Sequence, residues 1–225
     1  MNKHIYYLGG LTGIGNPSTN DWRKYKNWLR SFILISLLSV GAVSHAGTLH
    51  DAAKSGDLEQ VQRLIVQGAD VNQKTSRDET PLIIASLAGQ GEIANYLLQR
   101  GADIDARNSS GLSSLHAAAY SGHTDIVSLL VVKGADVNNA ANRFGVTPLH
   151  LASEENHIDT VEALLKHGAN VDAVEANGYS VLSRAGFREH WNVLKVLLAS
   201  GAVCQKADKV GDWLYQECTA RANTN

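Results

Sequence analysis

Apolar residues recur along the chain at helical spacing, and the pattern restarts at a nearly fixed step. Each period ends in a pair of large apolar residues, and three residues later comes a glycine followed by alanine. The apolar pairs are Leu64-Ile65, Leu97-Leu98, Leu130-Val131, Leu164-Leu165 and Leu197-Leu198. The glycines are Gly68, Gly101, Gly134, Gly168 and Gly201, separated by 33, 33, 34 and 33 residues. A period in this range predicts a stack of repeated units.

Each period contains the features of two helices joined by a turn. Thr80 and Thr147 are N-cap candidates, and each is followed by a proline, which suits the first helical turn because the N–H it lacks has no partner there. A short helix is expected next, then a turn, then a longer helix such as residues 92–100. Gly101 suits the left-handed C-cap position that follows it. One unit cannot bury both helical faces, so we expect the units to stack around a shared core.

Within each unit a leucine is followed three residues later by a small residue. These pairs are Leu49 and Ala52, Leu82 and Ala85, Leu115 and Ala118, Leu149 and Ala152, and Leu182 and Ala185. The stretch 144–152 reads F-G-V-T-P-L-H-L-A. In these features the chain resembles the ankyrin repeat family over residues 48–205. The resemblance implies an all-α solenoid of about five helix-turn-helix repeats, with short hairpin linkers and a C-terminal capping helix.

A leader precedes the repeats. A basic region over residues 23–30 is followed by an apolar run over 32–43 and by small residues at 44 and 46, which is the layout of a secretory signal peptide cleaved after Ala46. We therefore divide the chain into a leader (1–46), the repeats (47–205) and a C-terminal cap and tail (206–225), and expect a periplasmic or secreted protein. The alternative is an uncleaved membrane anchor, although the uncharged stretch 31–46 is shorter than the ~20 residues of a spanning helix.

The charge of the chain argues against two classes of partner. Its 225 residues include 20 basic and 22 acidic ones, for a net charge of −2. Cleavage after Ala46 removes five basic residues and one acidic residue. The mature chain then has 15 basic and 21 acidic residues and a net charge of −6. Nucleic acid and anionic membrane surfaces both attract basic proteins, so neither is expected to bind. We expect a monomer that binds a protein partner.

The two cysteines, Cys204 and Cys218, both lie in the C-terminal segment. In the repeat register Cys204 aligns with the apolar Val71 and Val137, and Cys218 aligns with the small residue Ala185. An even number of cysteines in an exported chain predicts a disulfide between them. The alternative is that both are small buried hydrophobic residues with free thiols.

Motifs for catalysis are missing from the sequence. It contains no nucleophile elbow and no phosphate-binding loop in the repeat region, so we expect neither an enzyme nor a cofactor. Metal binding is not expected either, because the histidines are spread one per repeat rather than clustered. The resemblance implies structural roles for His50, His116 and His150, and for His123, His157 and His190. Glu154 and Glu155 are adjacent on a helix and are expected on its solvated face.

Ankyrin proteins usually hold partners with the hairpin tips and the concave face of the first helices, and the resemblance carries this to matching positions here. The tip residues are Arg77, Arg107, Arg143, Phe144 and Tyr179, with Asp78, Asn108 and Asn177 beside them. The helix residues are Leu87, Tyr120, Glu154 and Phe187, with Lys54 in the first repeat. Arginine and aromatic residues are enriched in interfaces. Equally, the arginines could be solvated and the aromatic side chains could fill local packing.

The function expected from these features is non-catalytic binding of a protein partner outside the cytoplasm. One alternative is an accessory or protective factor for a specific exported enzyme, and another is a membrane-anchored ankyrin scaffold. A solenoid that binds a small molecule or a metal is disfavoured, because no single repeat combines several histidines and carboxylates.

Overall fold

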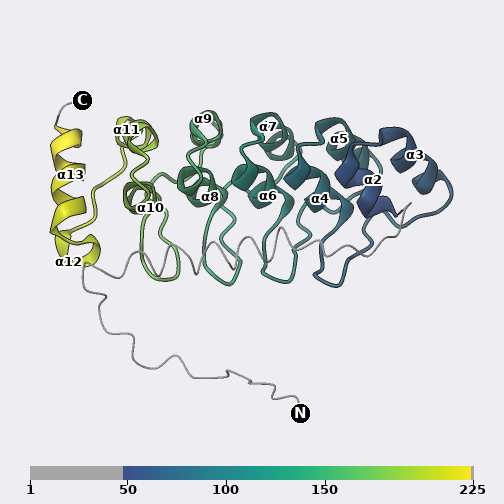
Figure 1. The fold of residues 1–225 in the computed structure, drawn as a ribbon, viewed down its shortest axis with the longest axis horizontal. Coiled ribbons are helices and arrows are strands. Elements are labelled where there is room, and N and C mark those ends of the chain that lie inside the picture. Colours follow the sequence, from purple (N-terminus) through teal and green to yellow (C-terminus); the bar gives the residue numbers. More distant parts are fainter. Residues whose placement is uncertain (1–47, 224–225) are drawn as a thin grey trace, which may run out of the picture.

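The computed structural model describes residues 48–223, and in these residues five helix pairs stack side by side (Figure 1). The inner helices are α2 (Leu49–Ser55), α4 (Pro81–Ala88), α6 (Ser114–Ser121), α8 (Pro148–Glu154) and α10 (Val181–Phe187). The outer helices are α3 (Leu58–Val66), α5 (Gly91–Gln99), α7 (Thr124–Val132), α9 (Ile158–Lys166) and α11 (Trp191–Ala199). Hairpin loops project beyond the row of inner helices, and α12 (Ala207–Val210) and α13 (Asp212–Ala222) cover the C-terminal end. The predicted all-α solenoid with a C-terminal cap is confirmed.

The inner helices begin where the sequence predicts. The hydroxyl of Thr80 accepts a hydrogen bond from the Ile83 N–H at 3.3 Å, and Thr147 accepts one from the His150 N–H at 3.4 Å. Pro81 and Pro148 occupy the first helical turn in these two repeats. The N-cap hydroxyl satisfies an N–H that has no partner within the helix, so it fixes where each inner helix starts.

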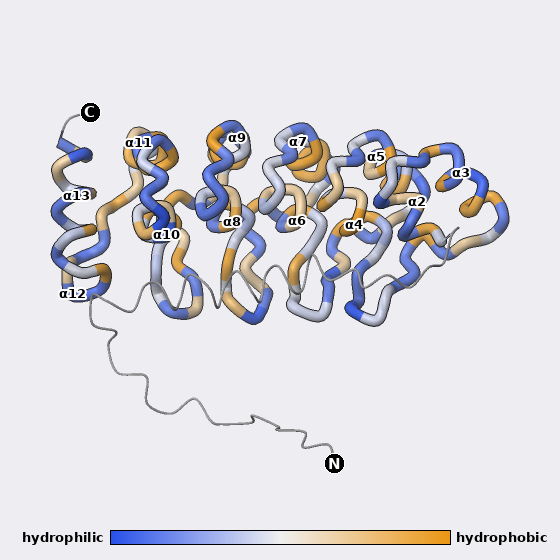
Figure 2. Tube along the Cα trace, viewed as in Figure 1, coloured by the Kyte–Doolittle hydropathy of each residue, from blue (hydrophilic) through white to orange (hydrophobic). Residues whose placement is uncertain are grey.

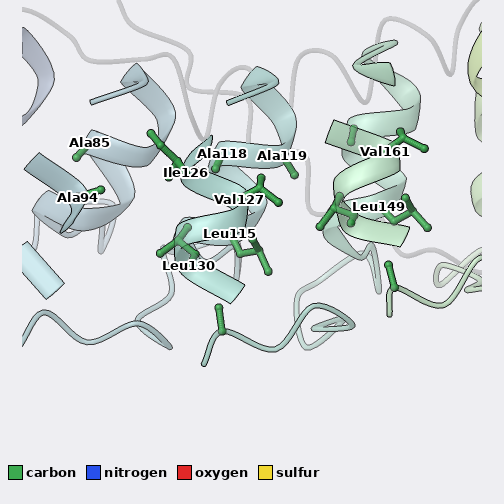
Figure 3. Close-up of a cluster of buried hydrophobic side chains, with 14 of the residues drawn as sticks. Ala85, Ala94, Leu115, Ala118, Ala119, Ile126, Val127, Leu130, Leu149 and Val161 are labelled. Carbon is green, nitrogen blue, oxygen red and sulfur yellow. The ribbon is translucent and has the colours of Figure 1, made fainter. Parts of the chain in front are cut away.

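One continuous hydrophobic core runs the length of the stack. It contains the inner-helix leucines and the small residues three positions later, together with outer-helix residues such as Val127 and Val161. Figure 3 shows these side chains filling the space between successive helices, and Figure 2 shows hydrophobic segments in both helix rows along the whole stack. Because each repeat buries its apolar face against its neighbours, the core depends on the stack rather than on any one unit.

Histidines link each repeat to the one before it. The Nε2 atoms of His123, His157 and His190 donate to carbonyl oxygens in the last turn of the preceding inner helix, at 3.2, 2.9 and 2.9 Å. The acceptors are Leu87, Tyr120 and Glu154. Gln90 makes the same link to the Lys54 carbonyl at 3.3 Å. The structural role expected for these histidines is therefore confirmed.

A second set of histidines holds the starts of the inner helices. His116 Nδ1 lies 2.9 Å from the Ser113 hydroxyl, and its Nε2 donates to the Val146 carbonyl of the next repeat at 3.1 Å. His150 Nδ1 lies 2.8 Å from the Thr147 hydroxyl. Both imidazoles are fully buried. Burial lowers the pKa of His116 from 6.5 to about 4 and that of His150 to about 3, and the charges of Arg107 and Arg184 add to the two shifts.

We expect the stability of the protein to fall as the pH drops below 6.5. Above that pH both states hold these two histidines neutral, whereas below it the unfolded chain binds protons that the folded chain does not take up until about pH 4. The two histidines together should therefore lower the free energy of unfolding by about 2 kcal/mol when the pH falls from 7 to 5.5. Denaturant unfolding across that range measures the loss, and His116→Gln should remove about half of it. A pH-independent midpoint would contradict the assignment.

The C-terminal cap is attached by a disulfide. Cys218 on α13 is bonded to Cys204, in the loop after α11, with their Cα atoms 5.9 Å apart. This agrees with the pairing predicted from the sequence. Within residues 48–223 no helix is long and apolar enough to cross a membrane. The predicted signal peptide lies outside the described residues.

Candidate protein-binding surface

The central repeats carry an apolar strip on the side of the inner helices and hairpin tips. Leu87 and Tyr120 lie at the ends of α4 and α6, and Phe144 lies at the hairpin tip before α8. All three are partly buried and pack against Leu112, Val146 and Leu151, which form a small hydrophobic cluster separate from the main core. We call Leu87, Tyr120 and Phe144 the central strip. Because this packing underneath restrains their side chains, they offer apolar surface at a low entropic cost of binding.

The three tip arginines differ in their surroundings. Arg107 is partly buried, and its guanidinium donates to the Asn139 Oδ1 at 2.9 Å and to the Ala141 carbonyl at 2.7 Å. It therefore joins its own hairpin to the next one. Arg143 is exposed, while Arg77 is partly buried. Arg107 thus has a structural role between two hairpins, whereas Arg143 is exposed to solvent next to the central strip.

The neighbouring tip residue Asn108 is also structural. Its side chain is buried, and its Oδ1 accepts hydrogen bonds from the N–H groups of Ser110 and Leu112, each at 3.0 Å. These bonds hold the shape of the hairpin that carries Leu112 into the small cluster. Asn142 has the same role one repeat later. Its Oδ1 accepts hydrogen bonds from the N–H groups of Phe144 and Val146, each at 3.1 Å. The hairpins therefore position the central strip.

The prediction that Glu154 lies on a solvated face was wrong. Glu154 is only 6 % exposed, and its carboxylate forms ion pairs with Arg184 and Arg188 of the next repeat. Arg184 Nε donates to Oε2 at 3.0 Å, and Arg188 donates to Oε1. Arg184 is also buried, with a side chain that is 7 % exposed, and the Arg188 side chain is 10 % exposed. Glu154 thus stabilises the junction of two repeats and is not part of the exposed surface.

Aromatic residues continue the surface toward the C-terminal end. Tyr179 at the last hairpin and Phe187 at the end of α10 make an edge-to-face contact with ring centroids 5.4 Å apart. Lys209 of the cap lies over the Tyr179 ring at 5.0 Å and donates to the Asn177 carbonyl at 2.6 Å. The predicted residues Tyr179 and Phe187 are therefore brought together, with a cation from the cap beside them.

Three residues of this region were missed by the sequence interpretation: Arg184, Arg188 and Lys209. A signal for Arg184 was present, because its register position holds Ile84, Ala117 and Leu151 in the three preceding repeats and is charged elsewhere only in the first repeat, at the exposed Asp51. A charge at a position that is apolar in the neighbouring repeats indicates a buried partner. In the part of the chain that the structure describes, no group of three or more His, Cys, Asp or Glu residues could hold a metal ion.

Comparison with known proteins agrees with the geometry. No curated protein matches this chain significantly. The family described as ankyrin repeats (3 copies) matches residues 49–141 and 136–208, which is more than half of the 225 residues. Ankyrin repeats generally serve as protein–protein interaction modules. With its five stacked helix pairs, projecting hairpins and inter-repeat histidines, the chain belongs to the ankyrin repeat family.

Proposed function

We propose that the protein is a non-catalytic interaction module that acts outside the cytoplasm and binds a protein partner through the inner helices and hairpin tips. The central strip is the observation that carries this proposal. It places one aromatic or aliphatic side chain on each of three successive repeats, at α4, at α6 and at the tip before α8, and these side chains pack on a small apolar cluster of their own. Preorganised aromatic residues near the centre of a surface are typical of binding hot spots.

The surroundings of the strip support a protein partner over a charged ligand. The buried charges of Glu154, Arg184 and Arg188 are paired with one another, and Arg107 is bonded to the next hairpin. These groups are therefore occupied within the scaffold. Arg143 remains exposed at the edge of the strip, where it can pair with a carboxylate of the partner.

An extracytoplasmic location is supported by the leader and by the disulfide. Disulfides persist in oxidising compartments and are rare in the cytosol. The alternative roles are an accessory or protective factor for one exported enzyme and a membrane-anchored scaffold. N-terminal sequencing of the protein isolated from cells separates the last of these, because an anchor would retain residues 32–43.

We expect Tyr120→Ala to weaken binding by about 1–3 kcal/mol, because the variant removes the middle member of the central strip. Tyr96→Ala is the matched control. Tyr96 is also partly buried but lies on the outer helix α5, against the Arg100 guanidinium at 4.9 Å. The measurement is the affinity for a partner captured from the oxidising compartment, together with a melting curve for each variant. Equal affinities per folded molecule for Tyr120→Ala and the unchanged protein would refute the proposed surface.

A further inference from the structure

The capping helix α13 is held to the stack by few buried side chains. Of its eleven residues, Leu214 and Cys218 are buried. Its large side chains Trp213 and Tyr215 are 51 % and 38 % exposed. One of the two buried anchors is thus the disulfide cysteine itself. The covalent link therefore contributes a large part of what keeps α13 in place.

Besides α12, which precedes it in the cap, α13 contacts α10 and α11 of the fifth repeat. Leu214 packs so closely on α10 that a Cβ on Gly186 would lie 2.4 Å from its Cδ1. Trp213 makes an edge contact with Trp191 at 6.0 Å between centroids, and the Arg221 guanidinium lies 4.3 Å from the centroid of the same ring. These contacts cover the end of the main core, to which Cys218 itself belongs.

The other cysteine of the disulfide is attached to the stack independently of α13. Next to Cys204, the Gln205 side chain accepts hydrogen bonds from the Ser180 N–H at 2.9 Å and from the Ser183 hydroxyl at 2.5 Å. It also donates to the Gly178 carbonyl at 2.8 Å. Breaking the S–S bond would therefore leave Cys204 on the fifth repeat, whereas α13 would be held by its noncovalent contacts alone.

The two sulfur-bearing residues differ in access. Cys204 is partly exposed, whereas Cys218 is 2 % exposed. A thiolate from solvent therefore approaches the disulfide from the Cys204 side. Attack there forms a mixed disulfide on Cys204 and expels Cys218 as a thiolate, which takes a proton from water. The second thiol of a dithiol reductant then releases Cys204 as a thiol, and the reductant leaves as its own disulfide.

We propose that the Cys204–Cys218 disulfide is a redox switch for the cap: a dithiol reductant opens it, α13 detaches, and the apolar end of the fifth repeat becomes accessible. The change is local, because each repeat of a solenoid contacts only its neighbours. The central strip lies on α4, α6 and the hairpin before α8, and none of its residues contributes to the cap contacts described above. The switch goes beyond the proposed function, since it holds whether or not the central strip binds a partner.

Hydrogen exchange of the full chain, oxidised and after reduction by a dithiol, tests the switch. We expect amides of α13 to exchange at least tenfold faster after reduction, with up to roughly 100-fold allowed by the loop entropy of a closed loop of this size. Amides of α6 and α8 should change less than about twofold. Local opening of this kind would support the proposal.

Cys204→Ser is the matched control, because it removes the S–S bond and leaves Cys218 as a thiol, as reduction does. Its α13 amides should exchange like those of the reduced protein, and the reductant should leave them unchanged. Thiol titration establishes that reduction is complete. Unchanged protection of α13 with both thiols free would overturn the proposal, and so would an equal loss of protection in all five helix pairs.

Discussion

Glu154→Ala should destabilise the protein by about 3–5 kcal/mol, because it leaves the buried charge of Arg184 and the largely covered charge of Arg188 without their carboxylate. Removing one partner of a buried ion pair costs far more than the pair contributes net, since the remaining charge stays desolvated. The loss should appear in denaturant unfolding as a lower midpoint.

Glu59→Ala is the control for Glu154→Ala. Glu59 pairs with Arg63 on α3 at 4.0 Å, with side chains that are 82 % and 58 % exposed. An exposed pair of this kind contributes about 0–1 kcal/mol, so this variant should unfold nearly like the unchanged protein. If both variants lose less than about 1 kcal/mol, the carboxylate of Glu154 is effectively solvated and the buried ion pair is the wrong description.

Gly122→Ala should cost about 2–4 kcal/mol for two independent reasons. The residue has a φ of 76°, which any side chain occupies with strain. In addition, a Cβ at this position would lie 2.5 Å from Nδ1 of His157, the histidine that donates to the Tyr120 carbonyl. The substitution would therefore push the next repeat away and weaken the hydrogen bond from His157 that links the third and fourth repeats.

Gly134→Ala separates the two contributions. Gly134 belongs to the same repeat and has a φ of 103°, but an added Cβ would meet no atom within 4 Å. The Gly134→Ala variant should lose only the stability that backbone strain costs, about 1–2 kcal/mol. Thermal or denaturant unfolding of both variants gives the difference. Equal losses would mean that the close approach of His157 contributes nothing and that backbone strain alone selects glycine.

The histidine links bear on the proposed function because they order the proposed binding surface. His157 fixes the end of α6, where Tyr120 lies, and His123 fixes the end of α4, where Leu87 lies. The small cluster beneath them holds Phe144 in turn. A surface that is ordered before binding loses less entropy when it binds, so these links suit the central strip to the binding role that we propose for it.

The features that the sequence determined by itself are those that repeat. The period of the glycines predicted the stack, and Thr80 and Thr147 predicted the helix starts. These predictions succeeded because a solenoid places the same register position beside itself in the next repeat. Residues that share a position in the sequence repeat therefore also lie next to one another in the folded stack.

Only the tertiary structure decided where the long and charged side chains go. Register placed Glu154 on the inner side of its helix, yet its carboxylate is buried because two arginines 30 and 34 residues later reach back to it. Arg107 likewise turns toward the next hairpin instead of solvent. A long side chain has several rotamers, and the neighbouring repeat selects among them by the partners it offers. Those partners are the residues in which one repeat differs from the next, so the shared period carries no information about them.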